Sequence, residues 1–366
     1  MNILIFLIIL LVLVLVHEFG HFFTAKKFGI RVDEFGFGFP PKLFGRKYGE
    51  TEYSLNLLPI GGFVKIFGEN PDEENMNGVD RNRSFVNKAK WKQAIVLFAG
   101  VFANFLLAWV MLSIGFMSGL PTSVGSEIGG SRLTDVNLVV VSVTTESPAE
   151  KAGLKSGDKI VNINSGEDKI SEINPDTVKS FILSHGNKEI EIGYSRGINK
   201  NINYAKLTPA ISVTNDKPVI GIAMDQIGIA QLPIFTAFWE GIKLTLFITQ
   251  NTAAGLYTLI FDGLQGKGSF SSVTGPVGMV GIVGDAYQFG FVYLLSFAAL
   301  ISINLAIINL LPFPALDGGR LFFLLIEKIK GSRINPKFAN TTNMIGFGIL
   351  ILLMLVVTYH DVVKLF

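Results

Sequence analysis

The apolar positions of the chain gather into four long runs that predict four transmembrane helices. Each run is apolar at nearly every position. Each also holds about the 20 residues that a helix needs to cross a hydrocarbon core. The runs lie at residues 3–25, 93–118, 290–312 and 343–364.

A fifth apolar stretch, residues 233–262, has a different pattern. Its polar residues Glu240, Lys243, Gln250 and Asn251 fall within an arc of about 100° at helical pitch. A single polar face is typical of a helix that lies in the membrane interface. We therefore expect an interfacial amphipathic helix at 233–262, with a fifth span as the alternative.

Polar residues dominate the region between the second span and this helix, which predicts an inserted domain. Its short β-like runs are Leu138–Val143, Lys159–Asn164 and Glu189–Tyr194. The expected fold is an α-helical membrane protein with four transmembrane helices and one inserted domain. Its parts are a membrane part at 1–118, the inserted domain at 125–227, the interfacial helix at 233–262 and a second membrane part at 290–366.

The basic residues predict the orientation. Lys and Arg are abundant in residues 26–92, between the first two spans. They are abundant again in residues 320–337, where Glu327 is the sole acid. Because loops rich in Lys and Arg stay in the cytoplasm, both loops are predicted to be cytoplasmic. Both termini and the inserted domain are then extracytoplasmic, and the protein is expected in the cell membrane.

Composition narrows the chemistry. The chain is 49% hydrophobic, and its net charge of +2 gives no reason to expect nucleic-acid binding. It has no cysteine and four histidines, so a metal site must use His and carboxylate ligands. His185 and His360 stand alone in the sequence and are expected to be structurally incidental.

The other two histidines lie in His17-Glu18-Phe-Gly-His21, at the end of the first span. On a helix, His17 and His21 lie one turn apart on the same face, at the spacing that binds one zinc ion. Glu18 is then placed to act as general base toward a water molecule. Ionisable residues inside a span are costly and indicate a functional site. The pattern predicts a zinc hydrolase with its active site in the membrane, toward the cytoplasmic side.

Asp317 is the candidate for a third ligand. It follows Pro312 and Pro314, which end the third span because proline lacks a backbone donor. It therefore lies at the same depth and side as His17. A fifth crossing at 233–262 would move Asp317 to the opposite membrane face, which favours four spans. The alternative is that Asp317 only caps a helix in the cytosolic loop.

Further motifs accompany these residues in the other spans. They are Phe98-Ala-Gly-Val-Phe-Ala-Asn104, Ser302-Ile-Asn304-Leu-Ala-Ile-Ile-Asn309-Leu-Leu-Pro-Phe-Pro and Leu316-Asp317-Gly318. Together with His-Glu-x-x-His, they closely resemble the site-2 protease family of intramembrane zinc metalloproteases, in its bacterial RseP-type form. The resemblance covers essentially the whole chain.

The resemblance implies a role for each site residue. His17, His21 and Asp317 are expected to hold Zn²⁺, and Glu18 is expected to activate the water. Asn309 is expected to help hold the substrate backbone near the metal. Asn304 is expected to make helix–helix hydrogen bonds in the membrane instead.

Residues 33–67, after the first span, are predicted to form a β element. Pro59, Gly61 and Gly62 indicate the turn of a hairpin. The resemblance implies that this element re-enters the membrane beside the active site. Its edge would offer hydrogen bonds to an unwound substrate strand. An ordinary cytosolic hairpin is the alternative.

Residues 152–160 read Ala-Gly-Leu-Lys-Ser-Gly-Asp-Lys-Ile. This resembles the signature of bacterial PDZ domains and implies one extracytoplasmic PDZ-like domain. PDZ domains capture extended peptides by strand addition. We expect this one to act as a size filter or gate, and a peptide ligand is the alternative.

These observations favour an intramembrane zinc endopeptidase that acts on transmembrane protein substrates within the lipid bilayer. The resemblance implies regulated intramembrane proteolysis of anti-sigma factors or remnant signal peptides. A membrane-tethered zinc peptidase acting on non-transmembrane chains is one alternative, but no second Glu-rich helix supplies its third ligand. A non-catalytic PDZ scaffold is another. It would be expected to lack Glu18 or a ligand, and all four residues are present.

Overall fold

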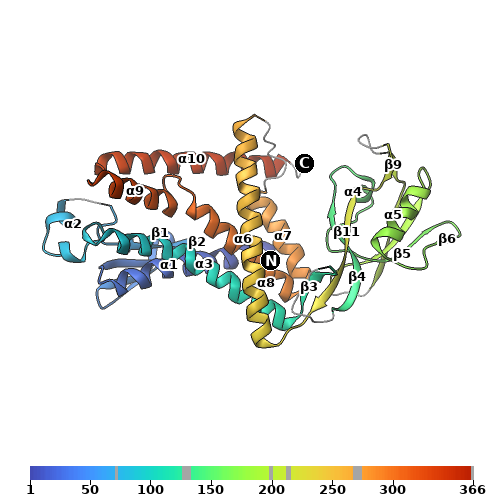
Figure 1. Cartoon of the computed structure of the whole chain (residues 1–366), viewed down its shortest axis with the longest axis horizontal. Coiled ribbons are helices and arrows are strands. Elements are labelled where there is room, and N and C mark those ends of the chain that lie inside the picture. Colours follow the sequence, from blue (N-terminus) through green and yellow to red (C-terminus); the bar gives the residue numbers. More distant parts are fainter. Residues whose placement is uncertain (71–72, 126–132, 198–200, 212–215, 267–273, 364–366) are drawn as a thin grey trace. The chain divides into compact units, whose positions relative to one another are not determined.

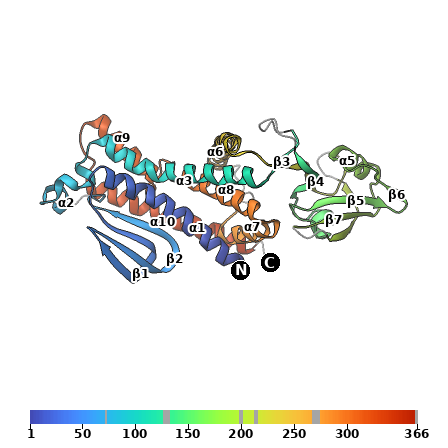
Figure 2. The same cartoon turned by 90° about the horizontal axis from the view of Figure 1, so that it is seen from below.

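The computed structural model describes residues 1–70, 73–125, 133–197, 201–211, 216–266 and 274–363. The chain divides into two units, which are drawn in Figures 1 and 2. Unit 1 contains Met1–Leu112, Gly241–Gly284 and Phe297–Phe366, and unit 2 contains Ser113–Glu240 and Asp285–Ser296.

Five helices in the described part of the chain are long and apolar enough to cross a membrane, so this is a multi-pass membrane protein. Four of them coincide with the predicted spans, although residue 364 of the last span lies outside the described residues. The five are α1 (Asn2–Lys27), α3 (Lys90–Ser118), α6 (Ile234–Leu264), α8 (Phe291–Leu310) and α10 (Pro336–Val363).

Helix α6 corresponds to the stretch at 233–262 and differs from the other four. Its mean hydropathy of 1.2 is the lowest of the five. In Figure 1 it runs across α1, α3 and α10 rather than alongside them, and Figure 2 shows it end-on. Its expected polar face is not uniformly solvated. Glu240 is only 6% exposed, while the apolar Leu246 and Phe247 are more than 60% exposed, at 63% and 64%.

A bent β-sheet lies beside α1. It consists of β1 (Val32–Tyr48) and β2 (Thr51–Ile66), so the predicted β element at 33–67 is present. Residues 34–37 of β1 pair on one side with residues 62–65 and on the other with residues 52–55. The segment 62–66 is therefore an edge of the sheet. Many apolar side chains of the sheet are exposed, namely Phe37, Phe39, Leu43, Phe44, Leu55, Leu57 and Leu58.

Shorter helices connect the spans of unit 1. Helix α9 begins directly at Asp317, and ion pairs of Arg320 with Glu69 and of Glu327 with Lys90 tie it to the N-terminal part. The connecting elements are α2 (Glu73–Asn77), two 3-10 turns (Arg81–Arg83 and Phe85–Asn87), α7 (Pro276–Phe289) and α9 (Asp317–Lys330).

Unit 2 is built on a twisted sheet whose strand order is β3-β11-β4-β5-β7-β8, with β6 paired to β5. Apolar side chains of the sheet, such as Val140 and Ile192, pack against Val178 of α5. The strands are β3 (Leu120–Ser123), β4 (Thr134–Val143), β5 (Lys159–Ser165), β6 (Asp168–Lys169), β7 (Ile190–Ser195), β8 (Ile202–Leu207) and β11 (Ile222–Ala230); a separate pair is β9 (Ala210–Ile211) and β10 (Pro218–Val219); the helices are α4 (Pro148–Lys151) and α5 (Pro175–Ser184).

The sheet of unit 2 extends past the expected limits of 125 and 227 on both sides. The reason is that β11 pairs with β3 through Ile227–Ala230, which adds residues 120–123 to the domain. The three predicted β runs coincide with β4, β5 and β7. Within the PDZ-like signature, the fully buried Asp158 accepts hydrogen bonds from Arg196 and from the backbone N–H of Lys155.

Candidate active site

The two histidines of α1 meet Asp317 at the start of α9. Nε2 of His17 lies 2.9 Å from Oδ2 of Asp317, and Nε2 of His21 lies 3.2 Å from the same oxygen. The two Nε2 atoms are 3.1 Å apart. Among the described residues, these three form the only group of His, Cys, Asp or Glu placed to hold a metal ion. Residues 300 positions apart in the sequence therefore share one site.

The donor atoms have the spacing of a zinc site. Ligand atoms about 2.0–2.1 Å from a tetrahedral zinc ion lie about 3.3 Å apart. The observed separations of 2.9–3.2 Å are close to that value. Space is reserved as well: a Cβ on Gly100 would lie 2.3 Å from Nε2 of His21 and 2.9 Å from Cε1 of His17. The residues present therefore fit a zinc ion with three protein ligands.

The surroundings of Asp317 favour its ionised form, which is the form that binds a metal. Burial raises the pKa of Asp317, but the charges and hydrogen bonds of His21 and His17 outweigh burial and hold the pKa below its usual value. The carboxylate is thus available as an anionic ligand.

The geometry does not support the alternative that Asp317 is a helix cap. The N-cap of α9 is Leu316, which makes no side-chain capping hydrogen bond, and Asp317 is already inside the helix. The preceding turn is tight, because Ala315 has a φ of 77° and a Cβ on Gly318 would lie 2.2 Å from the carbonyl oxygen of Leu310. This turn directs the Asp317 carboxylate toward the histidines.

Glu18 lines a cavity together with two residues of the cluster, His17 and Asp317. The cavity has a volume of about 200 Å³. The backbone of Val64, in the edge segment 62–66, lies near the Glu18 carboxyl. A Cβ on Gly62 would lie 3.9 Å from Cγ of Glu18. The sheet edge therefore runs directly past the candidate general base. The lining residues are Val14, His17, Glu18, Leu305, Asn309, Ala315, Leu316 and Asp317.

Comparison with known proteins identifies the family. A family model described as peptidase family M50 matches residues 5–353 of the chain. The chain belongs to peptidase family M50. This is the site-2 protease family, and the M50 chain is a zinc metalloprotease whose cofactor is Zn²⁺. The sequence-based predictions of family, enzyme class and metal are thereby confirmed.

Relatives of this M50 peptidase match it over nearly their full length. A provisionally named zinc metalloprotease of Clostridium acetobutylicum is 35% identical and covers 99% of this chain and 97% of its own. The regulator of sigma-W protease RasP of Bacillus subtilis is 30% identical, and the match covers 99% of this chain and 98% of that protein. The zinc metalloprotease RasP of Shouchella clausii is also 30% identical, and the match covers 99% of this chain and 98% of that protein.

Among solved structures, a PDZ domain of an SdrC-like protein from Listeria monocytogenes aligns with part of the chain. The TM-score is 0.21, the identity is 22%, and the match covers 26% of this chain and 93% of that one. A likeness this slight does not define the fold of unit 2.

Two asparagines and two histidines outside the cluster were also considered from the sequence. Asn309 lines the cavity of the M50 site, whereas Asn304 is not among the lining residues. His185 does not belong to the cluster. It is buried in unit 2 beside Asp168, with its Nε2 3.3 Å from the Asp168 carboxylate. His360 lies in α10 and belongs to no metal-binding group of the described residues.

Three contacts at the histidines come from α3 and were not assigned a role from the sequence. His21 Nδ1–H donates to the carbonyl oxygen of Val96, at 2.8 Å. Gly100 leaves room for both imidazoles, and the side-chain amide of Asn104 lies 3.3 Å from Nδ1 of His17. The available signal was the i, i+4 spacing of Gly100 and Asn104, which puts both on one helix face.

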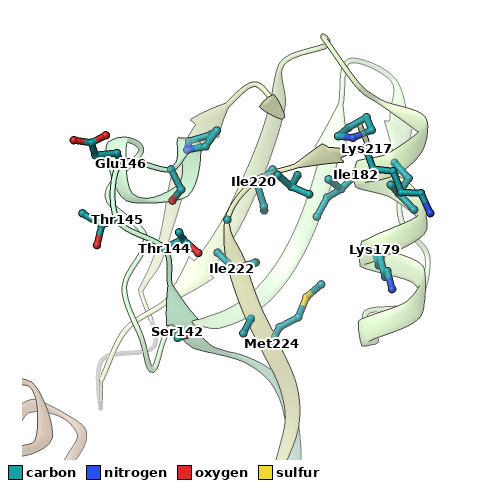
Figure 3. A pocket seen from close by; sticks show the side chains of 17 residues that line it. Ser142, Thr144, Thr145, Glu146, Lys179, Ile182, Lys217, Ile220, Ile222 and Met224 are labelled. Carbon is teal, nitrogen blue, oxygen red and sulfur yellow. The ribbon is translucent and has the colours of Figure 1, made fainter. Parts of the chain in front are cut away.

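Unit 2 holds a second cavity, of about 640 Å³, between α5 and β11. Ile222 and Met224 of β11 lie across from Lys179 and Ile182 of α5 (Figure 3). In this part of β11, residues 222–226 pair with β4. On the other side, β3 pairs from Ile227 onward, and the backbone N–H of Val124 donates to the carbonyl oxygen of Gln226. Within the described chain, residues 222–225 thus have a strand neighbour on one side and the cavity on the other.

Proposed function

We propose that this M50 zinc metalloprotease cleaves transmembrane protein substrates by hydrolysis inside the membrane, with His17, His21 and Asp317 as zinc ligands and Glu18 as general base. The observation that carries the proposal is the cluster of His17, His21 and Asp317 among apolar helices, with Glu18 lining the same cavity as His17 and Asp317. Because one relative is named a regulator of sigma-W protease, anti-sigma factors are the substrate class that we favour. Remnant signal peptides are a second class.

The chemistry follows from the residues around the cavity. A bound zinc ion supplies Lewis acidity and lowers the pKa of water. Glu18, on the cavity wall, takes the proton of the attacking water and passes it to the leaving amine. Asn309 lines the same cavity and holds the substrate backbone by its side-chain amide.

A substrate helix must unwind before its backbone can reach this site, since helical N–H and C=O groups are already paired. The edge segment 62–66 offers replacement hydrogen bonds by strand addition. Its position beside Glu18 supports this role. The exposed apolar side chains of β1 and β2 support the re-entrant placement over a cytosolic hairpin, because lipid covers such side chains without cost.

Four membrane crossings are the topology that we propose, with α6 in the outer interface. Asp317 contacts His17, near the cytoplasmic end of α1, and a crossing by α6 would place them on opposite membrane faces. The course of α6 across the other helices also supports an interfacial position (Figure 1). Both termini are then extracytoplasmic, and the active site lies toward the cytoplasm.

Unit 2 then lies outside the membrane as a PDZ-like domain. Its cavity beside residues 222–225 of β11 favours capture of an extended peptide, because that stretch pairs with β4 on one side and has its other edge available for strand addition. This observation shifts our preference from a size filter alone to a filter that also binds peptide.

The decisive experiment measures zinc content and cleavage of a model transmembrane peptide by the purified chain in detergent. Asp317→Ala should lower zinc occupancy and abolish cleavage, because two histidines alone make an incomplete site. Asp168→Ala is a matched control: it removes the carboxylate of the His185–Asp168 pair in unit 2 and should change neither quantity.

Full zinc content in Asp317→Ala would place the third ligand elsewhere. Cleavage of soluble peptides in preference to the transmembrane peptide would favour the membrane-tethered alternative. Zinc-bound protein that cleaves neither would favour the scaffold alternative.

A further inference from the structure

The histidines of the cluster are contacted from two sides. Each presents Nε2 to Asp317, and each presents Nδ1 to α3. A neutral imidazole carries one proton, so a histidine that binds a metal through Nε2 must carry its proton on Nδ1. That Nδ1–H group then needs an acceptor, since both imidazoles are buried.

For His21 the acceptor is plain. The carbonyl oxygen of Val96 lies 2.8 Å from Nδ1. A carbonyl can only accept, so it fixes the proton on Nδ1 and leaves the Nε2 lone pair for the metal.

For His17 the corresponding group is the side-chain amide of Asn104, which is fully buried, at 0% exposure. The amide nitrogen Nδ2 lies 3.3 Å from Nδ1 of His17. The amide oxygen Oδ1 has no hydrogen-bond partner among the described residues. An amide nitrogen donates only, so in this orientation it pairs with an unprotonated Nδ1, which is the wrong tautomer for a metal on Nε2.

A half-turn of the amide exchanges the two atoms. Oδ1 then takes the position beside His17, where it accepts from Nδ1–H. In its present position Oδ1 is buried and has no hydrogen-bond partner among the described residues. Carboxamides are well suited to this exchange because their oxygen and nitrogen occupy nearly the same volume.

We propose that Asn104 is a positioning residue for zinc: its amide oxygen accepts the Nδ1 proton of His17 and so fixes the tautomer that binds the metal through Nε2. This rests on the proposed ligation by His17, His21 and Asp317. Val96 and Asn104 then serve the two histidines in parallel from one face of α3, with Gly100 between them leaving room for both rings.

The backbone around Asn104 is held on two sides, which fixes the reach of its side chain. The Ser302 hydroxyl of α8 donates to the Asn104 carbonyl oxygen at 2.9 Å. Four residues back along α3, Gly100 faces the imidazoles. The residue before Gly100, Ala99, contacts α1 so closely that a Cβ on Gly20 would lie 2.3 Å from its carbonyl oxygen.

Two variants with the same branching at Cγ separate this role from simple packing. Asn104→Leu keeps the branched shape but has no acceptor, and it should weaken zinc affinity about 10–100-fold, the usual effect of losing such a contact. Asn104→Asp keeps an acceptor oxygen and should bind zinc within a few-fold of wild type. Asn304→Leu, a matched loss of an asparagine from α8, should leave zinc affinity unchanged.

Zinc affinity is measured by competition with a chelator in detergent, for variants that elute as folded monodisperse protein. A packing role predicts the reverse order, with Asn104→Leu tight and Asn104→Asp weak, and that order would overturn the proposal. Equal zinc loss in Asn104→Leu and Asn104→Asp would overturn it too. If the wild-type chain binds no zinc, the proposed function itself fails, which is a distinguishable result.

A second measurement needs no variant of Asn104. The chain has only four histidines, so ¹⁵N labelling of the imidazoles gives few signals. In zinc-loaded wild-type protein, the Nδ1 proton of His17 should exchange with solvent as slowly as the Nδ1 proton of His21. Rapid exchange at His17 with slow exchange at His21 would show that His17 has no acceptor and would overturn the proposal.

Discussion

Glu18 lies between two imidazoles and the edge of a sheet, and it coordinates nothing in the cluster. The groups placed to hold a metal are His17, His21 and Asp317. Glu18 instead lines the cavity, and the backbone of Val64 lies near its carboxyl group. A carboxylate so placed is available to carry a proton, and its contribution is separable from metal binding.

Glu18→Gln should therefore retain zinc and lose cleavage. Glutamine keeps the size and the Val64 contact but cannot accept a proton, and the loss of a general base typically costs ~10²–10⁴-fold in rate. Zinc content and the rate of cleavage of a model transmembrane peptide are measured together. Wild-type turnover in this variant would exclude Glu18 as the base, and a loss of zinc would make it a ligand.

At the residue scale, the sequence predicted the residues that meet at the cluster but not the residues that support them. His17 and His21 were predictable because helix geometry places residues i and i+4 on the same face. The contacts of Val96 and Asn104 depend on how α3 packs against α1, and no spacing within either helix determines that register.

At the scale of elements, the edge segment 62–66 packs against α1 beside Glu18. The segment is close-packed: a Cβ on Gly62 would lie 3.0 Å from the carbonyl oxygen of Gly36 and 3.2 Å from Cδ2 of Leu15. A side chain there forces the strand away from the helix. The cavity would then widen, although no proposed ligand would be touched.

Gly62→Ala should thus reduce cleavage while zinc stays bound. We expect a fall of about 10–100-fold in kcat/KM, because displacements near 1 Å at a reacting centre have effects of this size. Leu43→Ala is the matched control, since Leu43 is exposed on the part of β1 away from this edge and its loss should change little. Unchanged kinetics in Gly62→Ala would remove the sheet edge from the mechanism.

Turn residues at 59–62 were enough to predict a β element, yet not its pairing. Residues 34–37 pair on two sides, with residues 52–55 and with residues 62–65, because both strands bend. Such bends depend on long-range contacts and leave no periodic signal. Similarly, β3 at 120–123 was missed because its four residues become a strand only through pairing with β11.

At the scale of the whole molecule, the number of crossings determines whether one site can exist. Helix length and composition alone allow five spans, including α6. The sequence favoured four, because Glu240, Lys243, Gln250 and Asn251 lie in one arc of that helix. The burial of Glu240 shows why that argument was incomplete: a polar face can turn toward protein as well as toward water.

Ser332 provides the test of topology. It is exposed in the loop between α9 and α10, and the chain has no native cysteine to confuse labelling. If α6 lies in the outer interface, this loop is cytosolic, and Ser332→Cys in intact cells should resist a membrane-impermeant thiol reagent. Ser156→Cys, exposed in unit 2, should react once any outer barrier is opened.

The result bears directly on the metal site. If α6 crosses the membrane, the loop that follows α9 is external, and Asp317 lies about 30 Å from the histidines across the hydrocarbon core. No ligand bond of about 2 Å to a shared zinc ion is then possible. Ready labelling of Ser332→Cys from outside would thus overturn the four-span topology and Asp317 as a ligand together. Protection of Ser332→Cys, with labelling of Ser156→Cys, would place Asp317 and the histidines at one depth of the membrane.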